Sequence, residues 1–376
     1  MNEKEKIALV PRPPGTLEKA GTGTKRILSC MVGDTLALAK KDDLAPKTAK
    51  FRIGEYEWCE PDYLQIMAWA EQLGLSSLEV LRRLQEGLRD KGNETRIENG
   101  KLTKLNWDAG LLPVSDFRIS FPLELTELSF SPIAIIAEEG DLEGVEGLTA
   151  EGELPDGYDL SASVLKIFTV ALPKLKRLAC AAAGLESLSM GPAPALERFD
   201  CGATNGTNLS ALDLRSFPKL KEFVCTNNRF ECLDLGHVPE LLELDCGMNL
   251  IKKLDLRSVP KLRKLNCNDN DMQELILPSL PELVELNCEN SAYEDSGLEK
   301  IDLRGAPNLE HLNCSHNMLE SLNLSCVPKL KHLKCSWNPL TELNLTDVPL
   351  LETLKCYNIP IEYWSNRNPP FIGSLV

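Results

Sequence analysis

The stretch PELLELDCGMNLIKKLDLRSV (Pro239–Val259) is followed at once by PKLRKLNCNDNDMQELILPSL (Pro260–Leu280), and PKLKHLKCSWNPLTELNLTDV (Pro328–Val348) repeats the same pattern. The shared unit is P-x-L-x-x-L-x-C-x-x-N-x-L-x-x-L-x-L-x-x-V, about 21 residues long. Its copies open at Pro173, Pro194, Pro218, Pro239, Pro260, Pro281, Pro307, Pro328 and Pro349. A unit this short must bury its apolar positions against its neighbours, so the sequence predicts a solenoid.

Within each unit, the segment L-x-x-L-x-C alternates apolar and polar residues, which is typical of a short strand. Leu and Cys should point inward and the x positions outward, so that strands of successive turns stack as a parallel sheet. The segment L-x-x-L-D-L repeats the alternation and should lie on the far side of the coil. The next proline favours an extended chain where the coil turns back.

The chain contains 13 cysteines, and their spacing indicates their role. Nine of them occupy the same repeat position: Cys180, Cys201, Cys225, Cys246, Cys267, Cys288, Cys314, Cys335 and Cys356. No C-x-x-C or C-x-x-H motif occurs, which disfavours a metal framework. We therefore expect a ladder of small, buried, reduced thiols, as found in a reducing compartment.

An asparagine three residues after the cysteine recurs where the chain must bend away from the strand. The members of this column are Asn228, Asn249, Asn270, Asn317 and Asn338. A buried side-chain amide there can satisfy backbone groups of adjacent turns. We expect these residues to be structural and not catalytic.

The repeat pattern over residues 173–358 resembles leucine-rich repeat proteins, in particular the 21-residue bacterial variety with a cysteine ladder, as in internalin-type proteins. The resemblance implies a curved α/β solenoid of stacked parallel strands that binds another macromolecule, here with a small N-terminal α/β cap. Two further segments resemble degenerate turns with an aromatic residue in place of Cys: Leu102/Leu105/Trp107 and Leu125/Leu128/Phe130. Insertions interrupt the period at Gly202–Asn208 and Glu289–Gly297.

The domain organisation follows from these patterns and is expected to comprise a disordered tail (1–24), a small α/β domain or cap (25–98), degenerate repeats with an acidic insertion (99–172), and regular repeats to the C-terminal end (173–376). Within the cap, Arg26–Val32 and Thr35–Ala39 favour a hairpin, Lys50–Trp58 a strand, and Pro61–Leu73 and Ser77–Asp90 two helices.

The run AEQLGLSSLEVLRRL (Ala70–Leu84) is similar to helix-turn-helix DNA-binding segments, in which Arg82, Arg83 and Arg89 would touch phosphates. Against DNA binding, residues 1–100 carry equal numbers of basic and acidic side chains, 16 of each. Glu79 also lies on the would-be recognition helix. We therefore expect a small α/β cap that covers the open apolar end of the solenoid. The alternative is a DNA-associated regulator in which the helix-turn-helix-like segment 61–90 reads DNA and the repeats act as a partner sensor.

The whole chain of 376 residues has 41 basic and 56 acidic side chains, and the negative excess lies in residues 101–376. The segment Glu138–Asp159 is rich in acidic residues and lacks Lys and Arg, as expected of a solvated acidic insertion. Such a surface repels nucleic acid and anionic lipid. We expect no membrane partner and no nucleic-acid partner. Because no signal peptide is evident, we expect a cytoplasmic protein, with an exported effector as an alternative.

Candidate functional residues gather in the last three repeats. No nucleophile elbow, phosphate loop or HExxH helix occurs, so we expect no enzyme activity and no cofactor. The outward positions near the C-terminus instead carry His311, His316, His332, Lys334, Trp337, Lys355 and Tyr357. Earlier turns carry Glu222, Glu243, Asp200 and Asp245 in equivalent columns. Exposed aromatic residues among mixed charges favour a protein-binding hot spot on the concave face of a monomer, and a zinc site is the alternative.

Overall fold

The structure is a computed structural model, and it describes residues 51–86, 95–108, 116–131, 165–180, 185–202, 209–291 and 297–357. Three sequence expectations lie outside these ranges: the tail 1–24, the hairpin Arg26–Ala39 and the acidic insertion Glu138–Asp159. The inserted residues 203–208 and 292–296 are outside them as well.

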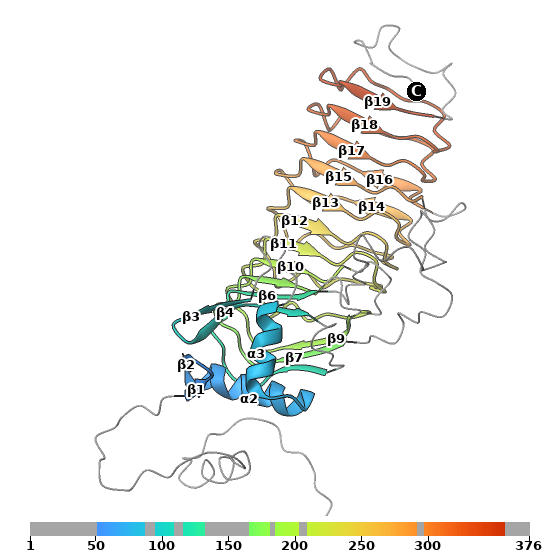
Figure 1. Ribbon diagram of the computed structural model, residues 1–376. Coiled ribbons are helices and arrows are strands. Elements are labelled where there is room, and N and C mark those ends of the chain that lie inside the picture. The colour runs from blue at the N-terminus through green and yellow to red at the C-terminus, as the bar shows by residue number, and fades with distance from the viewer. Residues whose placement is uncertain are drawn as a thin grey trace, which may run out of the picture. The chain divides into compact units, whose positions relative to one another are not determined.

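One strand from each repeat joins a 12-stranded sheet, which is visible in Figure 1 as a stack of short arrows. In spatial order its strands are β3 (Arg96–Glu98), β4 (Lys101–Asp108), β6 (Glu127–Ser131), β8 (Arg177–Ala179), β10 (Arg198–Asp200), β11 (Glu222–Val224), β12 (Glu243–Asp245), β13 (Lys264–Asn266), β15 (Glu285–Asn287), β17 (His311–Asn313), β18 (His332–Lys334) and β19 (Thr353–Lys355). All neighbouring pairs are parallel except β3 and β4. This is the leucine-rich repeat solenoid that the sequence predicts, and both degenerate turns belong to it.

The alternation of apolar and polar residues in the second half of the repeat predicts a strand in each turn, but only some of the described turns form one. Near the N-terminal end, β5 (Asp116–Ile119), β7 (Leu165–Thr169) and β9 (Leu185–Met190) make a three-stranded parallel sheet. Further on, β14 (Glu274–Ile276) pairs only with β16 (Lys300–Asp302). In the other described turns, this side of the coil is irregular chain, which the solenoid tolerates because the apolar residues there remain buried.

The core is a continuous column of the inward Leu and Cys positions. Leu244 and Leu265 are each 2% exposed, and the ladder cysteines from Cys180 to Cys335 are all buried. Cys356, on the last rung described, is half-buried. Burial raises the pKa of the Cys267 thiol to about 12, so the thiol form is favoured. The inward assignment of the ladder is confirmed.

The asparagine column is buried and fully engaged with the backbone. The Nδ2 of Asn249 donates to the carbonyls of Cys225, Cys246 and Gly247 at 2.9, 3.1 and 3.0 Å. Its Oδ1 accepts the backbone N–H of Phe230 at 3.1 Å. Each of the other four asparagines donates to three carbonyls in the same way. The structural role expected from the sequence is confirmed.

The N-terminal region contains a hairpin and two helices. Strands β1 (Phe51–Ile53) and β2 (Tyr56–Trp58) pair antiparallel, so residues 50–58 hold two strands where the sequence suggested one. Helix α2 (Glu60–Leu73) ends at Gly74, whose φ of 65° suits glycine, and α3 (Ser77–Glu86) begins after Ser76. The expected helices are therefore present, although residues 87–90 of the second lie outside the described ranges.

Helix α2 packs on the core of the degenerate repeats. The Trp69 ring lies 5.1 Å from Trp107 and 5.7 Å from Phe117, between ring centroids, and its Nε1 donates to the carbonyl of Arg118 at 2.9 Å. The Asp62 carboxylate accepts the backbone N–H of Leu102 at 2.7 Å, and burial raises the pKa of this carboxyl. Helix α2 therefore packs against apolar side chains at the N-terminal end of the repeats.

The cysteine ladder leads to a labelling prediction. Among the cysteines of the described ranges, a thiol reagent should modify the exposed Cys232 first in the folded protein and leave Cys246 and Cys267 unmodified. All 13 thiols should react after denaturation. Cys246→Ser should lower the free energy of unfolding by about 1–3 kcal/mol, because it places a hydroxyl among apolar side chains. Cys232→Ser is the control and should change it little. Rapid labelling of Cys246 in the folded state would contradict the inward assignment.

Candidate binding surface

The solvent side of the 12-stranded sheet carries a groove of about 610 Å³ that runs over β11 to β19. We call this surface the groove face, and two columns of side chains define it. The first column contains Glu222, Glu243, Lys264, Glu285, His311, His332 and Thr353, which are in register with one another. The second contains Val224, Asp245, Asn266, Asn287, Asn313, Lys334 and Lys355.

The part of the groove over β11 to β15 is acidic and partly paired. Glu222 binds Arg198 of the preceding strand at 2.9 Å. Lys264 lies between Glu243 and Glu285, with its Nζ 3.8 Å from a carboxylate oxygen of each. All of these side chains are at least a third exposed, so the pairs are weak and the surface retains a carboxylate excess.

The second column contains a ladder of side-chain amides that the sequence reasoning missed. Asn266 donates to Oδ1 of Asp245, and Asn287 donates to Oδ1 of Asn266, both at 2.9 Å. Asn313 donates to a carboxylate oxygen of Glu289 at 2.7 Å. The signal is present in the sequence, since Asn occupies the residue before Cys in three turns, but it is less regular than the buried asparagine column.

The part of the groove over β17 to β19 carries histidine and lysine. The rings of His311 and His332 stack with centroids 4.5 Å apart and an angle of 19° between planes. The Nδ1 of His332 lies 2.8 Å from the hydroxyl of Thr353. Lys334 and Lys355 are adjacent in register, and both are exposed. Within the described ranges neither lysine has a carboxylate partner within 4.0 Å.

The other three predicted residues lie beside the groove, in the turns that follow the strands. The ring of Trp337 stacks on that of His316 with centroids 5.7 Å apart. The backbone N–H of Trp337 donates to the carbonyl of Tyr357 at 3.0 Å, which places the two aromatic residues in adjacent turns. The seven residues predicted from the sequence thus share one end of the solenoid, four inside the groove and three next to it.

The residue two positions after the ladder cysteine has a left-handed backbone in five of the described turns. Its φ is 57° at Trp337 and 56° at His316, and it is 55°, 52° and 49° at Asn227, Met248 and Asp269. This conformation therefore belongs to the turn of the repeat and is not particular to Trp337. Trp337 is in addition 53% exposed and Tyr357 44% exposed. Trp337 differs from the other residues at this position because it places a large exposed ring in a stack with an imidazole, which makes it a candidate contact residue.

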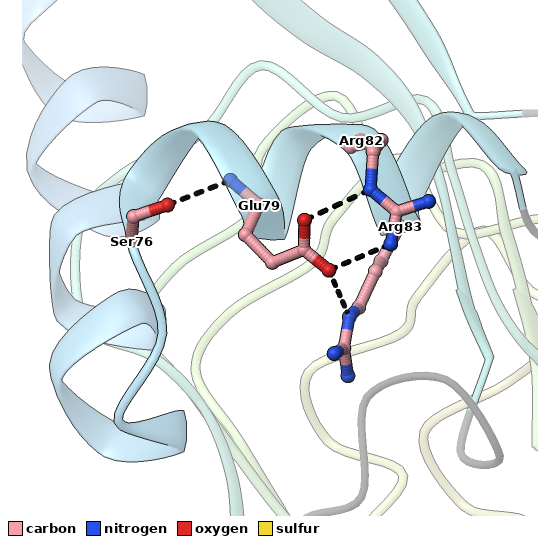
Figure 2. A network of polar contacts seen from close by, with 4 residues as sticks. All are labelled: Ser76, Glu79, Arg82 and Arg83. Carbon is pink, nitrogen blue, oxygen red and sulfur yellow. Dashed lines mark hydrogen bonds and ion pairs between the residues drawn. The ribbon is translucent and has the colours of Figure 1, made fainter.

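In helix α3, Arg82 and Arg83 both pair with Glu79 of the same helix, as Figure 2 shows. The Glu79 carboxylate accepts hydrogen bonds from Nε of Arg82 at 2.8 Å and Nε of Arg83 at 2.7 Å, and these bonds lower the pKa of Glu79 to about 2. The opposite side of the helix, with Val80 and Leu84, is buried. For this helix to bind DNA, Arg82 and Arg83 would have to break their ion pairs with Glu79 and bind phosphates instead. The third arginine, Arg89, lies outside the described ranges.

Metal-ligating clusters and membrane-spanning helices are both absent from the part of the chain that the structure describes. No group of three or more His, Cys, Asp or Glu side chains there lies close enough to hold a metal ion. The histidines His311 and His332 stack as a pair, and the same ranges supply no third ligand. No helix in these ranges is long and apolar enough to cross a bilayer.

Comparison with known proteins shows similarity at the level of fold. No family model and no curated protein matches the chain. Among solved structures, it is similar to the functional domain of InlJ from Listeria monocytogenes, which includes a cysteine ladder, with 23% identity, a TM-score of 0.41 and coverage of 68% of this chain and 48% of that one. The leucine-rich repeat protein LIC12759 of Leptospira interrogans has 20% identity, a TM-score of 0.39 and coverage of 70% and 66%. YopM from Yersinia enterocolitica has 20% identity, a TM-score of 0.35 and coverage of 70% and 64%.

The matched region spans about half the length of the InlJ structure and about two thirds of the other two. The architecture itself is established by the stacked strands, the thiol ladder and the asparagine column. The fold is a leucine-rich repeat solenoid.

Proposed function

We propose that the chain is a non-enzymatic protein-interaction module whose partner binds the groove face over β17, β18 and β19, together with the adjacent turns. The observation that carries this proposal is the exposed Trp337, which stacks on His316 and lies one turn from the exposed Tyr357. Exposed aromatic residues surrounded by charged groups are typical anchors of protein interfaces.

The surroundings of Trp337 support the same role. Tyr357 from the next turn is exposed, and Lys334 and Lys355 provide ammonium groups beside the stacked imidazoles of His311 and His332. The strands beneath are held by backbone ladders and buried leucines, so the side chains are presented on a rigid support. A rigid surface loses little conformational freedom on binding, which favours affinity.

Photo-crosslinking in cells of the native host tests this proposal. Tyr357→p-benzoylphenylalanine keeps an aromatic side chain at the proposed site, and Tyr56→p-benzoylphenylalanine on β2 is the matched control at a tyrosine that is 38% exposed. We expect irradiation to give a discrete crosslinked protein through position 357 and none through position 56. The same product from both positions, or from position 56 alone, would contradict the placement of the site.

A further inference from the structure

The groove face has opposite charge at its two ends. Over β11 to β15 it presents Glu222, Glu243 and Glu285 against one lysine, Lys264. Over β18 and β19 it presents two lysines without a carboxylate partner in the described part of the chain, together with two histidines from β17 and β18. The sign of the surface therefore changes along the stacking direction of the strands.

The two ends are far enough apart to act separately. Six strand spacings of about 4.8 Å separate β11 from β19, which amounts to roughly 29 Å along the groove. The Debye length at physiological salt is about 8 Å. Charges at one end are screened from the other, so each end interacts with the nearest charges of a partner and the two do not cancel.

The side chains at the two ends also differ in whether their charges and hydrogen-bonding groups already have partners within the chain. Lys264 offsets part of the acidic charge, and the amides of Asn266 and Asn287 bind within their own ladder. By contrast, each ammonium of Lys334 and Lys355 has three donors, and the two lysines are adjacent in register and exposed. A carboxylate is the group that best satisfies such donors in a protein partner.

We propose that the partner presents an extended segment of about nine residues with acidic side chains at one end and basic side chains at the other. This inference rests on the proposed function and names the chemistry that the site selects. The acidic end lies over Lys334 and Lys355, and the basic end lies over Glu222 and Glu243. The length follows from the groove, because an extended chain rises about 3.3 Å per residue along roughly 29 Å. The polarity of the groove then fixes the direction in which the segment binds.

Selection from a random 12-residue peptide library displayed on phage tests the inference with the full chain as target. We expect the recovered peptides to cluster Asp and Glu in one half and Lys and Arg in the other. A synthetic peptide of the recovered consensus should bind at least ten-fold more weakly to Lys334→Glu/Lys355→Glu. The matched control Lys252→Glu/Lys253→Glu makes the same charge change at two exposed lysines outside the groove and should keep full affinity.

The outcomes separate this inference from the proposed function. Peptides without charge clustering that still lose binding in Trp337→Ala would overturn the polarity and keep the interaction site. Peptides whose binding is unaffected by both Trp337→Ala and Lys334→Glu/Lys355→Glu would overturn both proposals. Recovery of no peptide above the background of the unselected library would also count against a segment-binding groove.

Discussion

Asn249→Ala is expected to lower the free energy of unfolding by about 2–4 kcal/mol. The amide of Asn249 binds two carbonyls of its own turn, and one carbonyl and one backbone N–H of the preceding turn, and the residue is 3% exposed. Alanine would leave the backbone N–H of Phe230 buried without a partner, which costs roughly 1–3 kcal/mol. The carbonyls of Cys225, Cys246 and Gly247 would each lose one hydrogen bond but keep another, from Asn228, Asn270 and the N–H of Asn227 respectively. The lost carbonyl bonds and the vacated space add to the cost. Urea unfolding followed by circular dichroism measures the change.

A matched substitution distinguishes this effect from the loss of any asparagine. Asn323 also binds backbone, since its Oδ1 accepts the N–H of Ser325 at 3.0 Å, but it is exposed and water can replace that bond. Asn323→Ala should change the free energy of unfolding by less than about 1 kcal/mol. If Asn249→Ala were as mild as Asn323→Ala, the asparagine column would not be a structural element of the solenoid.

The same repeat that predicts the fold also predicts which residues point inward. A period of 21 residues places Leu244, Cys246 and Asn249 in columns that must be buried, because each column meets its own copies in the neighbouring turns. The parallel sheet, the thiol ladder and the buried amides were therefore predictable without coordinates. The position of Trp337 and Tyr357 in adjacent turns follows from the same alignment.

Other contacts were not predictable because they depend on geometry outside the repeat. Gln65 and Trp69 of α2 both donate to the carbonyl of Arg118, roughly fifty residues away in the chain, and no local pattern indicates this pairing. The left-handed backbone two residues after the ladder cysteine is another case, because that position holds Asn, Met, Asp, His and Trp in five turns and shows no residue pattern. The stacking of Trp337 on His316 also became visible only in the structure.

The sequence indicated the charge polarity of the groove only as a change in residue type from the early to the late turns. The sequence showed acidic residues in early turns and His and Lys in late turns, but it could not show which charges neutralise each other. The structure adds that Glu222 is paired with Arg198, and that Lys264 lies between two glutamates. The C-terminal turns are the stronger candidate for binding, because their lysines are exposed whereas the acidic side chains of the earlier turns are partly paired.

The measurement that tests the central claim most directly is the affinity of a triple variant, Trp337→Ala/His332→Ala/Tyr357→Ala, for the protein crosslinked through position 357. Isothermal titration calorimetry should show binding weakened by about 100-fold, equivalent to roughly 3 kcal/mol, because the variant removes two aromatic anchors and one stacked imidazole. An unchanged circular dichroism spectrum and unfolding midpoint would show that the loss is not one of folding.

The control for this measurement carries three alanines at exposed apolar residues away from the groove face: Tyr56 on β2, Leu78 on α3 and Ile276 on β14. It should bind with the affinity of the unmodified chain. If the groove-face variant also kept full affinity, the partner would bind another surface and the groove face would not be the interaction site.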